Sequence, residues 1–154
     1  MGCNIHAYIE TKRKRIFWKQ NCWKLLEVFP YVKDAEGYGC HFSRNYNLYA
    51  YLADVRSYSD KSLAIVPPRG VPEDASKIYR ELVRQDGYDG HTNRRLTLDE
   101  LMQIPWDLKL SEGKPYETTL RKISDEFWNE IIRPMEVVVA LGGYDVRVVF
   151  HFDN

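Results

Sequence analysis

The sequence predicts an α+β domain, in which a mostly antiparallel sheet contains both terminal strands and helices pack on it. Alternation of apolar and mainly polar residues at 3–10 and 144–154 indicates the two terminal strands, and segments with helical spacing lie between them. We expect residues 1–154 to form a single domain, because a chain of this length buries roughly two thirds of its unfolded surface around one core.

The first strand is predicted at residues 3–10, where every second side chain from Cys3 to Ile9 is apolar. A period of two places one face of a strand in the core. The following segment 15–29, RIFWKQNCWKLLEVF, is rich in aromatic and branched residues and predicts a second strand. Its polar break at Gln20–Asn21 is typical of a tight turn, which would divide the segment into two strands.

A helix is predicted within residues 43–56, SRNYNLYAYLADVR, where apolar side chains recur at i, i+3, i+4 and i+7 from Leu48 to Val55. Either Asn45 or Asn47 would cap its N-terminus, because an asparagine side chain accepts hydrogen bonds from the first free backbone N–H groups of a helix.

Prolines stiffen the next connection, residues 65–74, IVPPRGVPED, which we expect to be extended. Asp74 is then the predicted cap of a helix over 75–85. The polar, glycine-punctuated segment 86–95, DGYDGHTNRR, predicts a loop.

Two further helices are predicted before the last strand. A short one within 96–104 is capped by Thr97, with Glu100 at the reciprocal position of a capping box. A longer one follows a Ser124 cap and runs to a stop at Gly142–Gly143, and Pro134 would kink or restart it.

The last strand, 144–154, alternates between valine or phenylalanine and mainly polar side chains. We expect the two terminal strands to pair where the sheet closes. In that case Asn4 and His6 share one face of the sheet with Arg147, His151 and Asp153.

Composition narrows the classes of partner. The 22 basic and 22 acidic side chains give zero net charge, which argues against binding to duplex nucleic acid. No apolar run approaches the roughly 20 residues of a membrane span, so no membrane partner is expected. The N-terminal residues lack the apolar core of a secretory signal, and the three cysteines have no CxxC spacing, so we expect reduced thiols in the cytoplasm.

Five segments, MGCNIHAYIE, RNYNLYAYLADVR, PPRGVP, LTLDEL and VRVVFHFDN, resemble a family of uncharacterised phage and bacterial proteins that usually begin MGCDIH and end near VFWFDN. The segments are spread over nearly the whole chain. Asn4 stands where the family has aspartate, and His151 where it has an aromatic residue. The resemblance implies a phage-type protein in a bacterial host cell, but no reaction, because the family carries no established activity.

Arginines in or beside stiff loops suggest an anion site, because the guanidinium group is a planar fork that suits phosphate and nearby aromatic rings can stack on a base. The same residues would otherwise be solvated, form salt bridges or fill helix faces. The first hypothesis is a phage accessory protein that sequesters an anionic, nucleotide-like small molecule, by analogy an immune signalling nucleotide, without turnover or cofactor. Its predicted ligand-binding residues are Arg44, Tyr46, Arg69, Tyr88, His91, Arg94 and Arg95.

The second hypothesis is an enzyme, a metal-assisted or acid/base phosphoesterase that uses His6, His151 and Asp153, with Asn4 orienting a ligand. A metal site built from Cys3 and His6 together is not expected, because their odd separation on one strand points them to opposite faces. His41, His91 and Asp153 are the remaining residues with suitable ligand chemistry for such a site. We expect no bound metal.

The third hypothesis is a protein-interaction module that blocks a host protein through exposed aromatic residues. Its candidate residues are Phe17, Trp18 and Trp23. We also expect a homo-oligomer, because the small domain carries a surplus of aromatic side chains.

Overall fold

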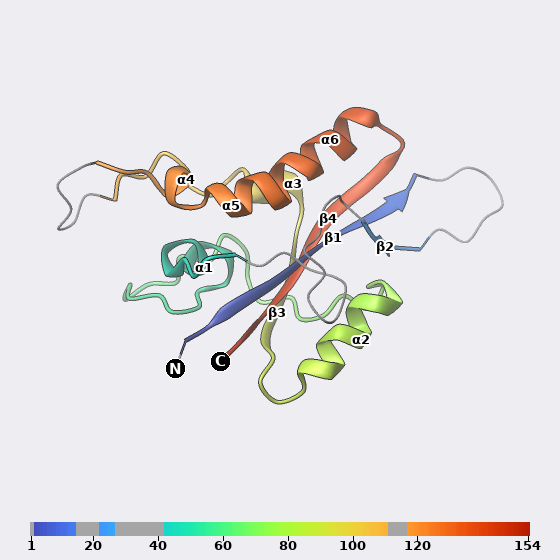
Figure 1. Cartoon of the computed structure of the whole chain (residues 1–154), viewed down its shortest axis with the longest axis horizontal. Coiled ribbons are helices and arrows are strands. Elements are labelled where there is room, and N and C mark those ends of the chain that lie inside the picture. The colour runs from blue at the N-terminus through green and yellow to red at the C-terminus, as the bar shows by residue number, and fades with distance from the viewer. Residues whose placement is uncertain (1, 15–21, 27–41, 111–116) are drawn as a thin grey trace.

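The computed structural model describes residues 2–14, 22–26, 42–110 and 117–154 and shows the predicted α+β fold. Its antiparallel sheet has the strand order β2-β1-β4-β3, so the two terminal strands lie at its centre. Helices flank the sheet on both sides, with α2 on one side and α4 to α6 on the other (Figure 1). The strands are β1 (Asn4–Arg13), β2 (Lys24–Leu25), β3 (His91–Leu96) and β4 (Tyr144–Asp153).

Strands β1 and β4 pair antiparallel along their whole length, from Asn4 opposite Asp153 to Arg13 opposite Tyr144. This register confirms that the terminal strands pair and that Asn4 and His6 share a face with residues of the C-terminal strand. His6 lies directly opposite His151. The pairing therefore places Asn4, His6 and His151 on one face of the sheet, as the sequence predicts.

One face of the sheet carries the main core, in which Ile5, Ala7 and Ile9 pack with apolar residues of β4. Helices α1 (Tyr46–Ala53) and α6 (Arg133–Leu141) contribute to the same core. Of the two predicted caps of α1, Asn45 is the one used, and its side chain accepts a hydrogen bond from the backbone N–H of Leu48 at 3.1 Å.

The other face of the sheet is covered by α2 (Lys77–Asp86), which packs Tyr79 and Leu82 against Tyr8 and Val149. The prediction that Asp74 caps this helix is wrong, because the cap is Ser76, whose hydroxyl accepts from the N–H of Tyr79. Asp74 instead accepts hydrogen bonds from Arg147 and Trp23. These long-range partners compete with the local capping role, and a local sequence pattern does not contain them.

The helical region before β4 begins earlier than predicted and is divided into four pieces. They are α4 (Leu120–Ile123), α5 (Asp125–Phe127), a π-helix at Trp128–Ile132 and α6. Ser124 is the N-cap residue of α5, as predicted, but its side chain makes no capping hydrogen bond and instead accepts from Asn45 at 2.8 Å. The π-helix ends just before the turn that contains Pro134, which lacks an N–H group, and Gly142 ends α6 as predicted.

Strand β3 lies in a segment for which the sequence predicts a loop, which is a further correction. It pairs with β4 at one edge of the sheet, and a bulge shifts the register between His91 and Arg94. The polar segment HTNRRL has no clear alternation of apolar residues, because an edge strand with a bulge does not present one regular face to the core. The short helix α3 (Leu98–Leu101) follows β3 with the predicted capping box of Thr97 and Glu100.

Two strands are predicted within residues 15–29, and the described part of this segment contains the short strand β2. Residues 15–21 and 27–29 lie outside the part of the chain that the structure describes. Among the described residues, no helix has the length and apolar character needed to cross a membrane.

Candidate functional site

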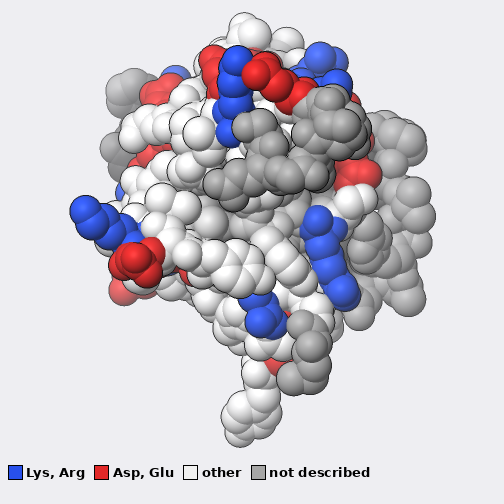
Figure 2. Space-filling view, turned by 90° about the vertical axis from the view of Figure 1, so that its left-hand side faces the viewer, with Lys and Arg blue, Asp and Glu red and all other residues white. Residues whose placement is uncertain are grey.

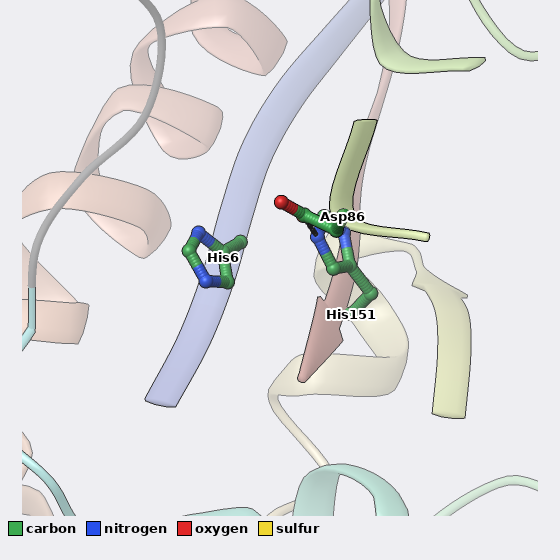
Figure 3. A group of neighbouring side chains, drawn as sticks. All are labelled: His6, Asp86 and His151. Carbon is green, nitrogen blue, oxygen red and sulfur yellow. Dashed lines mark hydrogen bonds and ion pairs between the residues drawn. The ribbon is translucent and has the colours of Figure 1, made fainter. Parts of the chain in front are cut away.

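Two histidines from the central strands form the middle of a polar site near the ends of the chain. His6 on β1 and His151 on β4 are opposite each other in the register, and their rings stack with centroids 5.0 Å apart and an interplanar angle of 9°. Asp86, the last residue of α2, reaches the same place (Figure 3). Three elements that are distant in the sequence thus meet at one point.

His151 is fully buried, and its Nε2 is hydrogen-bonded to a carboxylate oxygen of Asp86. Burial lowers the pKa of His151, and the Asp86 carboxylate opposes this only in part, so the imidazole is neutral at pH 7. Because the ionised carboxylate only accepts, Nε2 carries the proton and Nδ1 keeps its lone pair. That Nδ1 is buried and has no hydrogen-bond partner among the described residues.

His6 is about a quarter exposed and pairs with Asp153, with 2.9 Å between Nε2 and Oδ2. The other oxygen of Asp153 accepts from the backbone N–H of Asn4 at 3.1 Å and from its side-chain amide at 2.9 Å. Burial raises the pKa of Asp153, but hydrogen bonds from His6 and Asn4 outweigh it and hold this pKa below its ordinary value. Asp153 is therefore an ionised acceptor that orients the His6 ring, with Nε2 toward the carboxylate and Nδ1 on the other side of the ring to take a proton.

Arginine side chains lie at the same end of the two strands. Arg44 donates from Nε to the side-chain oxygen of Asn4 at 2.9 Å, and Arg56 donates to the side-chain oxygen of Asn154 at 3.4 Å. The Arg44 guanidinium lies over Gly2, where a Cβ atom would require this flexible end of the Arg44 side chain to move. Positive charge thus lies beside Asn4, whose side-chain amide donates to Asp153.

Strand β3 carries backbone strain beside this site. Thr92 has a φ of 55°, which is costly for a β-branched residue, and its hydroxyl lies 2.8 Å from Nδ1 of His91. His91 pairs in register with Phe152 and its ring stacks on that side chain, which belongs to the main core. His91 therefore lies on the opposite face of the sheet from His151.

The structure does not bring the predicted ligand-binding residues together in one place. Arg69 forms a two-pronged ion pair with Glu100, with distances of 3.0 and 2.6 Å, and also donates to the backbone oxygen of Arg95. Arg94 is buried and donates to the carbonyl oxygens of Val66 and Ala53. The side chains of Arg69 and Arg94 therefore make structural contacts within the protein.

The remaining predicted ligand-binding residues differ in how far their side chains are exposed to solvent. Tyr88 is fully exposed, Arg95 is half-buried, and the Tyr46 hydroxyl accepts from the N–H of Cys3 at 3.4 Å. On the face drawn in Figure 2, basic and acidic side chains are interspersed over the described part of the surface. Arg44 and Tyr46 are the members that lie near the end of β1.

The other candidate metal ligands, and the aromatic residues of the third hypothesis, do not join the histidine group. Cys3 lies in the core, on the face opposite His6, as the odd spacing predicted, and His41 lies outside the described residues. Phe17 and Trp18 lie outside them as well. Trp23 is half-buried under the Arg147 guanidinium, 3.9 Å from its ring centroid.

Sequence reasoning identified His6, His151 and Asp153, which the structure brings together with Asn4. It missed Asp86, which falls at the start of a predicted loop. The available signal was the Asp-Gly pair directly after a predicted helix, because it marks where the helix ends. The direction in which that end points, however, depends on how α2 packs on the sheet.

No family model, curated protein or solved structure matches the chain. The resemblance to the phage and bacterial family therefore stays a prediction, and the function has to be inferred from the geometry of the site.

Proposed function

We propose that the protein hydrolyses a phosphoester bond by acid/base catalysis, with His6 as the base that activates water. The observation that carries this proposal is the His6–Asp153 pair, in which a partly exposed imidazole is oriented by an ionised carboxylate. A histidine held in this way presents one fixed lone pair, and the carboxylate stabilises the imidazolium that forms when a proton is taken up.

The neighbouring residues have positioning roles in this proposal. Asn4 holds Asp153 through two hydrogen bonds to one oxygen, which fixes the carboxylate plane relative to His6. His151 is fully buried and cannot touch substrate, but its neutral ring stacks under His6. Because that ring carries no charge at pH 7, it does not repel a protonated His6.

The arginines at this end of the sheet support an anionic substrate. Arg44 is exposed, its Nε donates to the Asn4 side chain that also holds Asp153, and the rest of its guanidinium lies over Gly2. Guanidinium groups bind phosphate oxygens with charge-assisted hydrogen bonds and stabilise the charge that develops in phosphoryl transfer. Arg44 is therefore assigned to the phosphate group of the substrate.

The experiment compares hydrolysis of bis(p-nitrophenyl) phosphate and p-nitrophenyl phosphate by the full chain and its variants. His6→Ala and Asp153→Asn should each lower kcat by about 100-fold or more, since general acid/base catalysis contributes factors of this size. Arg44→Ala should act mainly on KM. Asp89→Asn, which removes an exposed carboxylate outside the site, should leave the rate unchanged.

Equal rates in the parent protein and in His6→Ala would contradict the proposal and attribute the activity to a contaminant. No turnover, together with binding of a nucleotide that Arg44→Ala weakens, would replace it with the sequestration hypothesis. Of the predicted anion-binding set, Arg44 is the arginine that contacts Asn4 of the histidine site, so the two functions are distinguished by turnover.

A further inference from the structure

Three side chains of the described residues have the chemistry and the spacing of metal ligands. One ring nitrogen each of His6 and His151 and one carboxylate oxygen of Asp86 all lie within 4.8 Å of one another. Ligand atoms around a bound Zn²⁺ sit about 2.0 to 2.2 Å from the ion, and a rearrangement of these side chains would bring the three atoms into that range.

These three ligands are typical of a metal site in which the protein leaves one coordination position open. Two imidazoles and one carboxylate are a common ligand set for a hydrolytic zinc ion, which keeps its fourth position for water. The three residues come from β1, β4 and the C-terminal end of α2, so the fold rather than a flexible loop sets their separation (Figure 3).

Two further observations point to a ligand at this place. Nδ1 of the buried His151 has a lone pair and no partner among the described residues, which costs free energy unless something binds there. His6 is held through Nε2 by Asp153, and metal-binding histidines characteristically donate their second ring N–H to a carboxylate. Asp153 would thus orient a ligand without touching the ion.

We propose that His6, Asp86 and His151 bind one divalent transition-metal ion of the Zn²⁺ type, with water in the remaining position. Binding requires the hydrogen bond between Asp86 and His151 to open and the His6 ring to turn, because lone pairs of parallel rings do not converge on one point. His6 and Asp86 are partly exposed and have room to move. The ion and the proton compete for His6, because the Nδ1 lone pair that would hold the ion is the one that takes up a proton in the function proposed above, so His6 acts as the base in the metal-free protein.

The test uses the full chain, stripped with a chelator and titrated with Co²⁺ and then Zn²⁺. We expect one equivalent of Co²⁺ to produce visible absorption bands and Zn²⁺ to displace it. His6→Ala and Asp86→Asn should each raise the Zn²⁺ dissociation constant more than about tenfold, since even residues that only orient ligands contribute factors of 10 to 100. Asp89→Asn is the matched control and should bind like the parent.

Circular dichroism of each variant separates a lost ligand from a lost fold, and it matters most for the buried neighbourhood of His151. Absence of Co²⁺ bands in the folded parent would overturn the proposal, as would equal affinities of the parent and the folded His6→Ala and Asp86→Asn variants. Hydrolysis that persists in chelator, without metal binding, would contradict the metal site alone. Metal binding without hydrolysis of either phosphoester by the metal-free protein would contradict the proposed function alone.

Discussion

The two halves of the polar sheet face use the same cross-strand geometry for different purposes. Toward the middle of β1, Glu10 lies opposite Arg147, and four residues away on the same face His6 lies opposite His151. Glu10 is fully buried and Arg147 nearly so, with 2.8 Å between Arg147 Nε and Glu10 Oε2. The backbone N–H of Ser76 donates to Glu10, and Asp74 accepts from Arg147.

The Glu10 and Arg147 side chains thus form an ion pair that is buried within the protein. At the histidine end, the side chains of His6 and Asp153 keep about a quarter of their surface exposed. A matched buried pair stabilises a particular pairing, whereas exposed imidazole beside an ionised carboxylate can exchange protons or bind a ligand. One sheet face therefore carries a structural pair at one end and reactive groups at the other.

We expect the greatest loss of stability from a change at the buried end. Arg147→Met leaves the Glu10 carboxylate buried without its charge partner, so the free energy of unfolding in urea should fall by about 3 to 5 kcal/mol. Lys109→Met is the control, because Lys109 and its partner Glu117 are both mostly exposed and this change should cost less than about 1 kcal/mol. Similar losses in the two variants would remove the contrast between the two ends of the sheet face.

The pH dependence of stability tests the histidine end. Burial lowers the pKa of His151, so the unfolded chain, with a histidine pKa near 6.5, takes up this proton more readily than the folded protein. The contribution of His151 to the free energy of unfolding is thus present above about pH 6.5 and is lost as the pH falls through the lowered folded pKa. Asp153, whose pKa is also lowered, adds a loss beginning near pH 4.

Histidine NMR signals measure this directly, because the His151 ring should stay neutral at a pH where an exposed histidine is already half protonated. Urea unfolding between about pH 7.5 and 5.5 should show declining stability, and His151→Gln should reduce that decline. A His151 ring that titrates at or above pH 6.5 would show that the buried, neutral state is absent.

A more modest change is expected from the strained residue in β3. Thr92→Gly removes the side chain that disfavours a positive φ and should stabilise the protein by up to about 1 kcal/mol, reduced by loss of the contact with His91. Thr11→Gly in β1 is the control and should destabilise, because glycine weakens a regular strand. Destabilisation by both changes in thermal melts would argue against strain at Thr92.

His6→Ala should change stability least, within about 1 kcal/mol, because His6 and Asp153 form a partly exposed pair. The same variant should lose hydrolysis, so its stability and its activity diverge. A loss of several kcal/mol in urea would make the histidine pair a structural feature like the Glu10–Arg147 pair, and the two ends of the sheet face would then serve one purpose.

Local signals in the sequence account for the features that depend on neighbouring residues. Alternation located the two terminal strands, Asn45 and the Thr97–Glu100 capping box began helices, and Gly142 ended one, because each signal acts within a few residues of the backbone it organises. In a strand, every second side chain points to the same face of the sheet. The expectation that the two terminal strands pair was therefore sufficient to predict that His6, His151 and Asp153 share one face.

Long-range packing, which no local pattern contains, decides the remaining features. Asp74 has the chemistry of a helix cap, but Arg147 and Trp23 engage it and Ser76 caps α2 instead. Asp86 meets His151, which lies 65 residues later in the chain, because α2 packs across the sheet. The polar strand β3 forms because β4 offers it a free edge, since backbone hydrogen bonds between strands depend on an available partner more than on side-chain pattern.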